Sequence, residues 1–176
     1  LNHGTSEPRV VWLSTQAGLR QGIHTRALGF MPLSHAIGFY GVFLATLALN
    51  GTYYVMSAFD PVTALNAVEK HQITYMFAVP QLYFAMGQAP NYSPDKMRST
   101  DLILYGGAEI DSGFLSQMDQ EWAGTVRHIY GTTETMCSLY HPDPVGQHRR
   151  LRPGFYSRTR IIRIGGDTNE VVAPGE

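Results

Sequence analysis

The sequence predicts an α/β fold, with a mostly parallel sheet flanked by helices and the start of an antiparallel β subdomain at the C-terminal end. Strand-like apolar runs alternate with helix-like runs about five times, which is the pattern of βαβ units. Apolar residues make up 44% of the 176 residues and charged residues 15%, so the chain can bury a core. The net charge of −1 excludes a strong field for nucleic acids or anionic membranes.

The first part of the chain alternates between the two kinds of run. Residues 8–20 predict a helix, and residues 27–33 predict an extended strand. The apolar run 36–49 has 14 residues, fewer than the roughly 20 of a membrane span, so we expect a buried helix. Asn50-Gly51 is a helix stop signal, and the β-branched and aromatic residues 52–56 predict the next strand.

Three later strands and the helices between them are marked by composition and by caps. The strand-like runs are residues 73–79, 101–105 and 125–130. Asp60 followed by Pro61 predicts a helix start before the first of these strands. Pro80 opens a short helix after it, and Asp111 or Ser112 caps a helix after the second.

The sequence changes character after Tyr140. A polar connection with prolines leads to residues 158–164, in which basic and apolar residues alternate. We expect residues 1–152 to form the central α/β part and residues 153–176 to begin the β subdomain. The arginines of this tail favour a solvated face, with phosphate or partner binding as the alternative; they are Arg149, Arg150, Arg152, Arg158, Arg160 and Arg163.

Three motifs follow predicted strands, at the point where each strand ends. They are PLSH (Pro32–His35), GGAE (Gly106–Glu109) and YGTTE (Tyr130–Glu134). Ligands of open parallel sheets bind at the carboxyl ends of the strands, near a switch in strand order. The agreement of three strand ends indicates a site more strongly than any one motif does.

The motif YGTTE has two interpretations from its residues alone. As a site, Gly131 permits a turn that brings N–H groups near a ligand, and the threonine hydroxyls can donate to phosphate oxygens. Glu134 then offers a hard oxygen to Mg²⁺, and Tyr130 can stack on a base. As a structural feature, the same residues form a capped turn at a helix start.

Other candidate residues leave alternatives open as well. From its residue type and place, His35 is a general base, a ligand or a core histidine. Cys137, the single cysteine, favours a buried wall position over a nucleophile, and it fits a reducing, cytoplasmic compartment. His141 and His148 have no partners at metal-ligand spacing, so we expect both to be solvated.

The order of these motifs resembles that of the adenylate-forming superfamily, which includes acyl- and aryl-CoA synthetases, luciferases and adenylation domains. The resemblance lies in GGAEI, a helix, a short strand and HIYGTTET, with MPLSHAIGFY upstream. It covers nearly the whole chain, and the connecting sequence is most similar to the 4-chlorobenzoate–CoA ligases. It implies a ligase that uses ATP and Mg²⁺ to activate a carboxylate as an acyl-adenylate and transfers the acyl group to coenzyme A.

The resemblance also implies roles for residues. Thr133 would hold the α-phosphate, Glu134 would reach Mg²⁺, and His35 would sit beside the reacting carboxylate. Tyr130 would stack on adenine, and the other nucleotide contacts would be Gly107, Ala108, Glu109, Gly131, Thr132 and Thr133. An apolar slot for an aromatic or other apolar acid would be lined by Trp12, His35, Ala36, Ile37, Phe77, Gly106, Ile129, Gly131, Met136 and Cys137.

Several parts implied by the resemblance lie outside this sequence: the phosphate loop, the ribose-binding aspartate and the small C-terminal domain with its lysine. We therefore expect an internal fragment of a large adenylation domain, inactive alone. The ligases have phenylalanine where Trp12 stands and asparagine where Cys137 stands, so the resemblance does not fix the ring substituent. A carrier-protein thiol as acceptor, a non-catalytic fragment that binds nucleotide weakly, and a homodimer of the parent are open alternatives.

Overall fold

A computed structural model describes residues 10–11, 18–19, 24–145, 151–154, 157–166 and 170–173. Its strands are β1 (Arg26–Gly29), β2 (Thr52–Val55), β3 (Tyr75–Ala78), β4 (Leu102–Gly106), β5 (Thr125–Thr132), β6 (Met136–His141) and β7 (Arg152–Pro153). They form one sheet in the order β2-β1-β3-β4-β5-β6-β7. The first five strands pair in parallel, whereas β6 pairs antiparallel with both β5 and β7. The predicted fold class is therefore confirmed.

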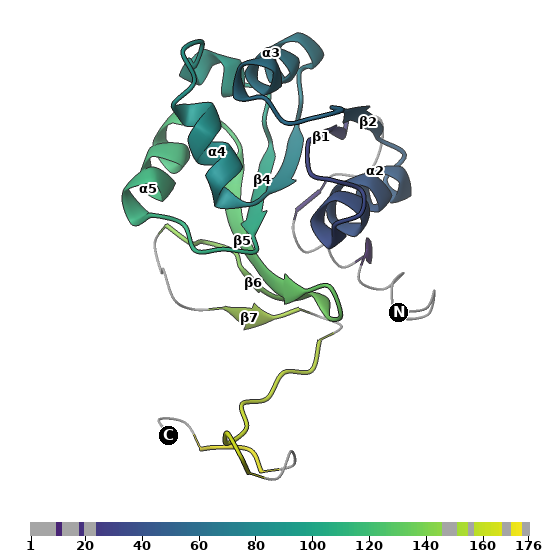
Figure 1. Ribbon diagram of the computed structural model, residues 1–176, viewed down its shortest axis with the longest axis vertical. Coiled ribbons are helices and arrows are strands. Elements are labelled where there is room, and N and C mark those ends of the chain that lie inside the picture. Colours follow the sequence, from purple (N-terminus) through teal and green to yellow (C-terminus); the bar gives the residue numbers. More distant parts are fainter. Residues whose placement is uncertain are drawn as a thin grey trace.

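Helical segments cover both faces of this sheet. They are the π-helix η1 (Ile37–Leu44), α2 (Ala45–Ala48), α3 (Pro61–His71), α4 (Pro80–Gly87), the 3-10 helix η2 (Pro94–Met97) and α5 (Ser112–Glu121). Figure 1 shows α4 and α5 on one side of the sheet and α2, which continues η1, on the other. In the sheet, β2 lies next to one edge of β1 and β3 lies next to its other edge. The strand order therefore reverses direction here, which creates a switch point between β1 and β3.

The helix signals predicted from the sequence are present. The Asp60 carboxylate accepts a hydrogen bond from the Thr63 N–H at 2.7 Å, and the Asp111 carboxylate accepts one from the Phe114 N–H at 2.9 Å. Asn50 has a left-handed backbone, with φ 56°, at the end of the apolar helical run. That run differs from the prediction in one respect, because residues 37–44 form a π-helix.

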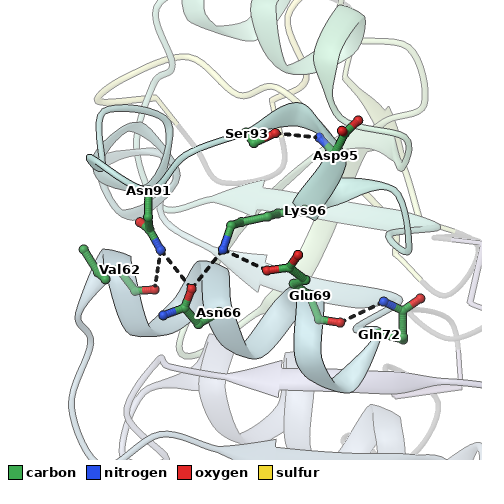
Figure 2. Close-up of polar contacts among 8 residues, drawn as sticks. All are labelled: Val62, Asn66, Glu69, Gln72, Asn91, Ser93, Asp95 and Lys96. Carbon is green, nitrogen blue, oxygen red and sulfur yellow. Dashed lines mark hydrogen bonds and ion pairs between the residues drawn. The ribbon is translucent and has the colours of Figure 1, made fainter.

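A polar cluster fastens the loop before β4 to α3 (Figure 2). The Lys96 ammonium donates to the Glu69 carboxylate at 2.8 Å and to Asn66 Oδ1 at 2.9 Å. Asn91 Nδ2 donates to the Val62 carbonyl at 3.1 Å and to Asn66 Oδ1 at 3.0 Å. Because the Lys96 side chain is only 17% exposed and its charge is paired, its role here is structural.

The tail forms less regular structure than the alternation of residues 158–164 predicts. The described residues beyond β7 contain one antiparallel bridge, between Ile162 and Val171, and this segment extends away from the sheet (Figure 1). Ile161 and Ile164 are exposed, so the alternation does not produce a buried face. The arginines described here are exposed, as predicted, while Arg149 and Arg150 lie outside the described residues. The boundary of a β subdomain near residue 153 stays a prediction.

Candidate active site

A pocket of about 340 Å³ opens at the carboxyl ends of the parallel strands. Its walls come from the segment after β1, from β3, from the end of β4 and from the β5–β6 hairpin. The lining residues are Val10, His35, Ala36, Ile37, Tyr40, Gly41, Phe77, Gly106, Gly107, Ile129, Gly131, Thr132, Thr133, Glu134, Met136 and Cys137. The pocket therefore lies at the edge of the sheet where the switch in strand order predicts a ligand.

The inner wall of the pocket is apolar and closely packed. Phe77 and Ile129 are each 3% exposed, and Met136 is 6% exposed. A Cβ atom on Gly41 would lie 2.6 Å from the Phe77 ring, and one on Gly106 would lie 2.3 Å from the Ile129 carbonyl oxygen. Backbone and side chains are thus in direct contact, and this wall suits an aromatic or aliphatic group.

The outer rim is the turn between β5 and β6, and two threonines hold it together. The Thr132 N–H donates to Thr135 Oγ1 at 3.1 Å, and the Thr135 N–H donates to Thr132 Oγ1 at 3.3 Å. All residues from Thr132 to Thr135 are exposed. The rim therefore presents hydroxyl groups and one carboxylate at the mouth of an apolar pocket.

Gly131 joins the rim to the inner wall. It pairs with Cys137 across the hairpin, and a Cβ atom on it would lie 1.4 Å from the Met136 carbonyl oxygen. Met136 itself has a left-handed backbone, with φ 54°, and the strand register shifts between Tyr130 and Gly131. No side chain fits at residue 131, so glycine is needed for this close approach of the two strands.

Glu134 supplies the negative charge of the rim. A hydrogen bond with the Thr132 side chain, and a second with its own backbone, lower the pKa of its carboxyl, so the group is ionised at neutral pH. The part of the chain that the structure describes contains no group of three His, Cys, Asp or Glu residues able to hold a metal. One hard carboxylate fits a Mg²⁺ ion whose other ligands are phosphate oxygens and water.

His35 borders the pocket and also caps the helical segment that follows it. Its Nδ1 accepts a hydrogen bond from the Ile37 N–H at 3.1 Å. In the neutral ring Nδ1 is then the acceptor, and Nε2 has the proton. The imidazole is exposed, so it combines a structural role with access to a ligand in the pocket.

The structure brings together most of the predicted site residues. Among the predicted acid-slot residues, every described one lines the pocket, and Trp12 lies outside the described residues. The predicted nucleotide contacts that line it are Gly107, Gly131, Thr132 and Thr133, and the predicted metal ligand Glu134 lines it too. The predicted contacts that do not are Ala108, Glu109 and Tyr130.

Tyr130 is separated from the acid slot by the geometry of its strand. Side chains alternate between the faces of a sheet, so Tyr130 points away from the face where Ile129 lines the pocket. Half of the Tyr130 side chain, 51%, is exposed, which leaves its ring available for stacking. The apolar pocket and the Tyr130 ring therefore lie on different sides of the end of β5.

Sequence reasoning missed Val10, Tyr40 and Gly41, which also line the pocket. Tyr40 and Gly41 follow Ala36 and Ile37 by one helical turn, and this spacing could have identified them. The wholly apolar run hid the signal, because it has no polar face to mark which side is buried. Val10 has no comparable signal in the sequence.

The structure corrects one interpretation and one prediction about local structure. In the structural interpretation of YGTTE, the helix start does not form, because β5 continues to Thr132 and turns into β6. The capped turn of that interpretation does form, since Thr132 Oγ1 accepts a hydrogen bond from the Thr135 N–H. His141 is not solvated: it ends β6, is 3% exposed, and its Nδ1 accepts a hydrogen bond from the Asp143 N–H at 3.2 Å. His148 lies outside the described residues. Cys137 is half-buried in the pocket wall, as predicted.

Comparison with known protein families identifies the family of this chain. The chain matches the family of AMP-binding enzymes over residues 5–176. It belongs to the AMP-binding enzyme family. This confirms the resemblance that the three strand-end motifs indicate.

Relatives of this chain include named ligases. It is 42% identical over 173 residues to a 4-chlorobenzoate–CoA ligase of Arthrobacter sp, covering 98% of the chain and 33% of that protein. It is 39% identical over 165 residues to the same-named enzyme of Pseudomonas sp. (strain CBS-3), covering 94% and 31%. It is 32% identical over 155 residues to a feruloyl-CoA synthase of Amycolatopsis sp, covering 86% and 31%. The chain thus spans about a third of the length of these relatives.

Solved structures share the fold of this chain. The o-succinylbenzoate coenzyme A synthetase of Bacillus subtilis, in complex with ATP and magnesium ion, aligns with a TM-score of 0.81 at 22% identity, covering 98% of the chain and 35% of that protein. Apo MatB of Rhodopseudomonas palustris aligns with a TM-score of 0.84 at 19% identity, covering 100% and 34%. At these identities the likeness shows the fold alone. In the described residues, no helix is long and apolar enough to cross a membrane.

Proposed function

We propose that this chain forms the central part of an ATP-dependent acid–thiol ligase that activates an aromatic or other apolar carboxylate. The observation that supports it most is the joining, in one pocket, of a buried apolar wall and a rim of threonine hydroxyls with an ionised carboxylate. An apolar acid needs the first, and the phosphates of ATP with Mg²⁺ need the second.

The reaction has two steps, and both develop charge on oxygen. A carboxylate oxygen of the acid attacks the α-phosphorus of ATP, forming an acyl-adenylate, and the bond to pyrophosphate breaks. The sulfur of coenzyme A then attacks the acyl carbon, and AMP leaves. Positioned donors stabilise such charge, and Thr133 offers its hydroxyl at the pocket mouth. The Thr132 hydroxyl instead bonds within the turn, to Thr135 and Glu134. Bound at Glu134, Mg²⁺ would neutralise phosphate charge.

The remaining residues position the reactants. Phe77, Ile129 and Cys137 would enclose the apolar part of the acid, with His35 beside its carboxylate at the mouth. Tyr130, on the other face of β5, would stack on adenine near the backbone of Gly107, Ala108 and Glu109. This arrangement orients the carboxylate toward the α-phosphorus, which lowers the entropic part of the barrier.

The test is pyrophosphate release by the full-length protein with ATP, Mg²⁺ and a panel of benzoates and fatty acids. Release that depends on the added carboxylate, and is highest for an apolar aromatic acid, is the expected result. No carboxylate-dependent release with any acid in the panel would contradict the proposal. Comparing coenzyme A with a pantetheinylated carrier protein then tests the acceptor, and coenzyme A is expected because the relatives above are named CoA ligases.

Two further expectations concern the setting of the protein. We infer a cytoplasmic location from the single cysteine among these 176 residues, which suits a reducing compartment, and from the use of ATP and coenzyme A. A homodimer of the full-length protein stays a prediction. Measurement of the molar mass in solution by light scattering distinguishes a monomer from a dimer.

A further inference from the structure

The hydroxyl of Tyr75 contacts Gly41, a residue of the pocket wall. Tyr75 is the first residue of β3 and is fully buried. It donates a hydrogen bond to the Gly41 carbonyl at 2.6 Å, across 34 residues of sequence. Burial raises the pKa of this hydroxyl well above its usual value, so it remains a donor at any working pH.

Gly41 lies in the middle of η1, a segment whose own sequence does little to fix its helical register. The sequence Ile37–Leu44 is almost wholly apolar, and the side-chain cap at its start comes from His35, which lies outside the segment. A π-helix is a rare conformation, and most segments of this length adopt the α-helical register. Contacts from outside the segment are therefore needed to hold η1 as it is.

β3 supplies such contacts at two points. The first is the hydrogen bond from Tyr75, and the second is the Phe77 ring, against which the Gly41 backbone is pressed. A Cβ atom on Gly41 would lie only 2.6 Å from that ring. The two side chains are two residues apart on one strand, so they point to the same face of the sheet and meet η1 together.

The register of η1 determines the shape of the pocket. Ile37, Tyr40 and Gly41 line it from this segment. A change from π-helical to α-helical bonding reduces the number of residues per turn. Tyr40 and Gly41 would then move around the helix axis relative to Ile37, and the width of the slot would change.

We propose that Tyr75 is a positioning residue whose hydroxyl holds the π-helical wall of the acid pocket and so determines which carboxylic acids the pocket accepts. The inference rests on the proposed function, since it concerns the selectivity of the same site. Tyr75 does not line the pocket, so it acts through Gly41 and not on the acid itself.

The chain contains a matched control in Tyr83 of α4. This tyrosine is also fully buried, and its hydroxyl donates to the Leu104 carbonyl at 2.8 Å. It contacts no residue of η1 through that bond, and it does not line the pocket. Tyr75→Phe and Tyr83→Phe each remove one buried hydroxyl bonded to a backbone carbonyl, so a general loss of stability should be similar in both.

The experiment compares the two variants in the full-length protein. Pyrophosphate release gives kcat/KM for benzoate and for a bulky para-substituted benzoate. We expect Tyr75→Phe to change the ratio of the two values by about five- to tenfold, mainly through KM, which corresponds to the loss of one hydrogen bond. We expect Tyr83→Phe to leave the ratio within about twofold. An unchanged ratio in Tyr75→Phe, or an equal change in both variants, would overturn the proposal.

Hydrogen exchange provides a readout that does not depend on activity. Amides of Ile37–Leu44 should exchange faster in Tyr75→Phe than in Tyr83→Phe, because only the first loses the contact with η1. Equal exchange in the two variants would show that the hydroxyl does not hold the segment. If the wild-type protein releases no pyrophosphate with any acid, the proposed function fails, while the exchange result still decides whether Tyr75 holds the wall.

Discussion

The inner wall and the outer rim of the pocket are stabilised in different ways. The wall consists of buried residues such as Phe77 and Ile129, against which the backbone of η1 packs at Gly41 and that of β4 at Gly106. The rim is exposed and is held by hydrogen bonds between Thr132 and Thr135, each worth about 1 kcal/mol. The wall is therefore part of the fold, whereas the rim can present reactive groups without a large contribution to stability.

The largest combined loss of rate and stability is expected where the wall and the rim meet, at Gly131. Gly131→Ala places a methyl group 1.4 Å from the Met136 carbonyl oxygen, so the hairpin must shift. We expect pyrophosphate release to fall by roughly 10²-fold and the unfolding free energy to fall by about 1–3 kcal/mol. Enzyme kinetics and urea unfolding of the full-length protein measure the two effects.

A matched control for this variant is Gly113→Ala, in the exposed first turn of α5. A methyl group there would meet only the Asp111 side chain, at 3.1 Å. We expect this control to be close to wild type in both rate and stability. If Gly131→Ala behaved like the control, the close approach of β5 and β6 would not matter for the site.

The rim alone is tested by Glu134→Gln. The amide keeps the shape of the side chain and removes the charge, so the Mg²⁺ ion proposed to bind there would lose its carboxylate ligand. We expect pyrophosphate release to fall by about 10²-fold or more, with an unchanged thermal midpoint because the residue is exposed. Loss of stability equal to that of a wall variant would show that the rim is part of the core after all.

Two ion pairs outside the pocket test whether solvent exposure determines how much a polar contact contributes to the unfolding free energy. Lys96→Met breaks the partly buried cluster with Glu69 and Asn66 (Figure 2), and we expect a loss of about 0.5–1.5 kcal/mol of unfolding free energy. Arg98→Met breaks an exposed pair with Asp95 at 2.7 Å, and we expect no measurable change in urea unfolding. Equal losses in the two variants would contradict this distinction.

A small effect on stability is expected from protonation of His128, a residue of β5 in the hairpin. Burial, and then the neighbouring His141, lower the pKa of His128, whose ring stacks on Tyr105 with centroids 4.7 Å apart. The unfolded state, with a pKa of 6.5, binds more protons than the folded state. This group therefore stabilises the fold fully above the unfolded pKa and progressively less as the pH falls below it.

His128→Phe removes this titration and keeps an aromatic ring against Tyr105. We expect the loss of unfolding free energy between about pH 7.5 and about pH 5.5 to be smaller in the variant than in the wild type. Urea unfolding at the two pH values measures it. An identical loss in both proteins would assign the acid sensitivity to another group.

The separate motifs of the site were predictable because each one lies at or near the carboxyl end of a strand. The composition predicts strand ends near Pro32, Gly106 and Tyr130, and the structure ends β1, β4 and β5 at Gly29, Gly106 and Thr132. The carboxyl ends of parallel strands meet at one edge of the sheet. The hairpin after Thr132 was not predictable from pattern alone, since threonine and glutamate also start helices. The burial of His141 follows from that hairpin, so it was missed for the same reason.

Local sequence by itself determined the caps and stops of this protein. Asp60, Asp111 and Asn50 act on backbone groups within a few residues, so their roles require no distant partner. Only the tertiary structure decided that Tyr75 bonds to Gly41, that Phe77 packs on the same segment and that Gly131 meets Met136. Such contacts depend on the pairing of strands and the placing of η1 over the sheet. Tyr75 and Gly41 are far apart in the sequence. Gly131 and Met136 are close in the sequence, but only the β5–β6 hairpin brings their backbones together.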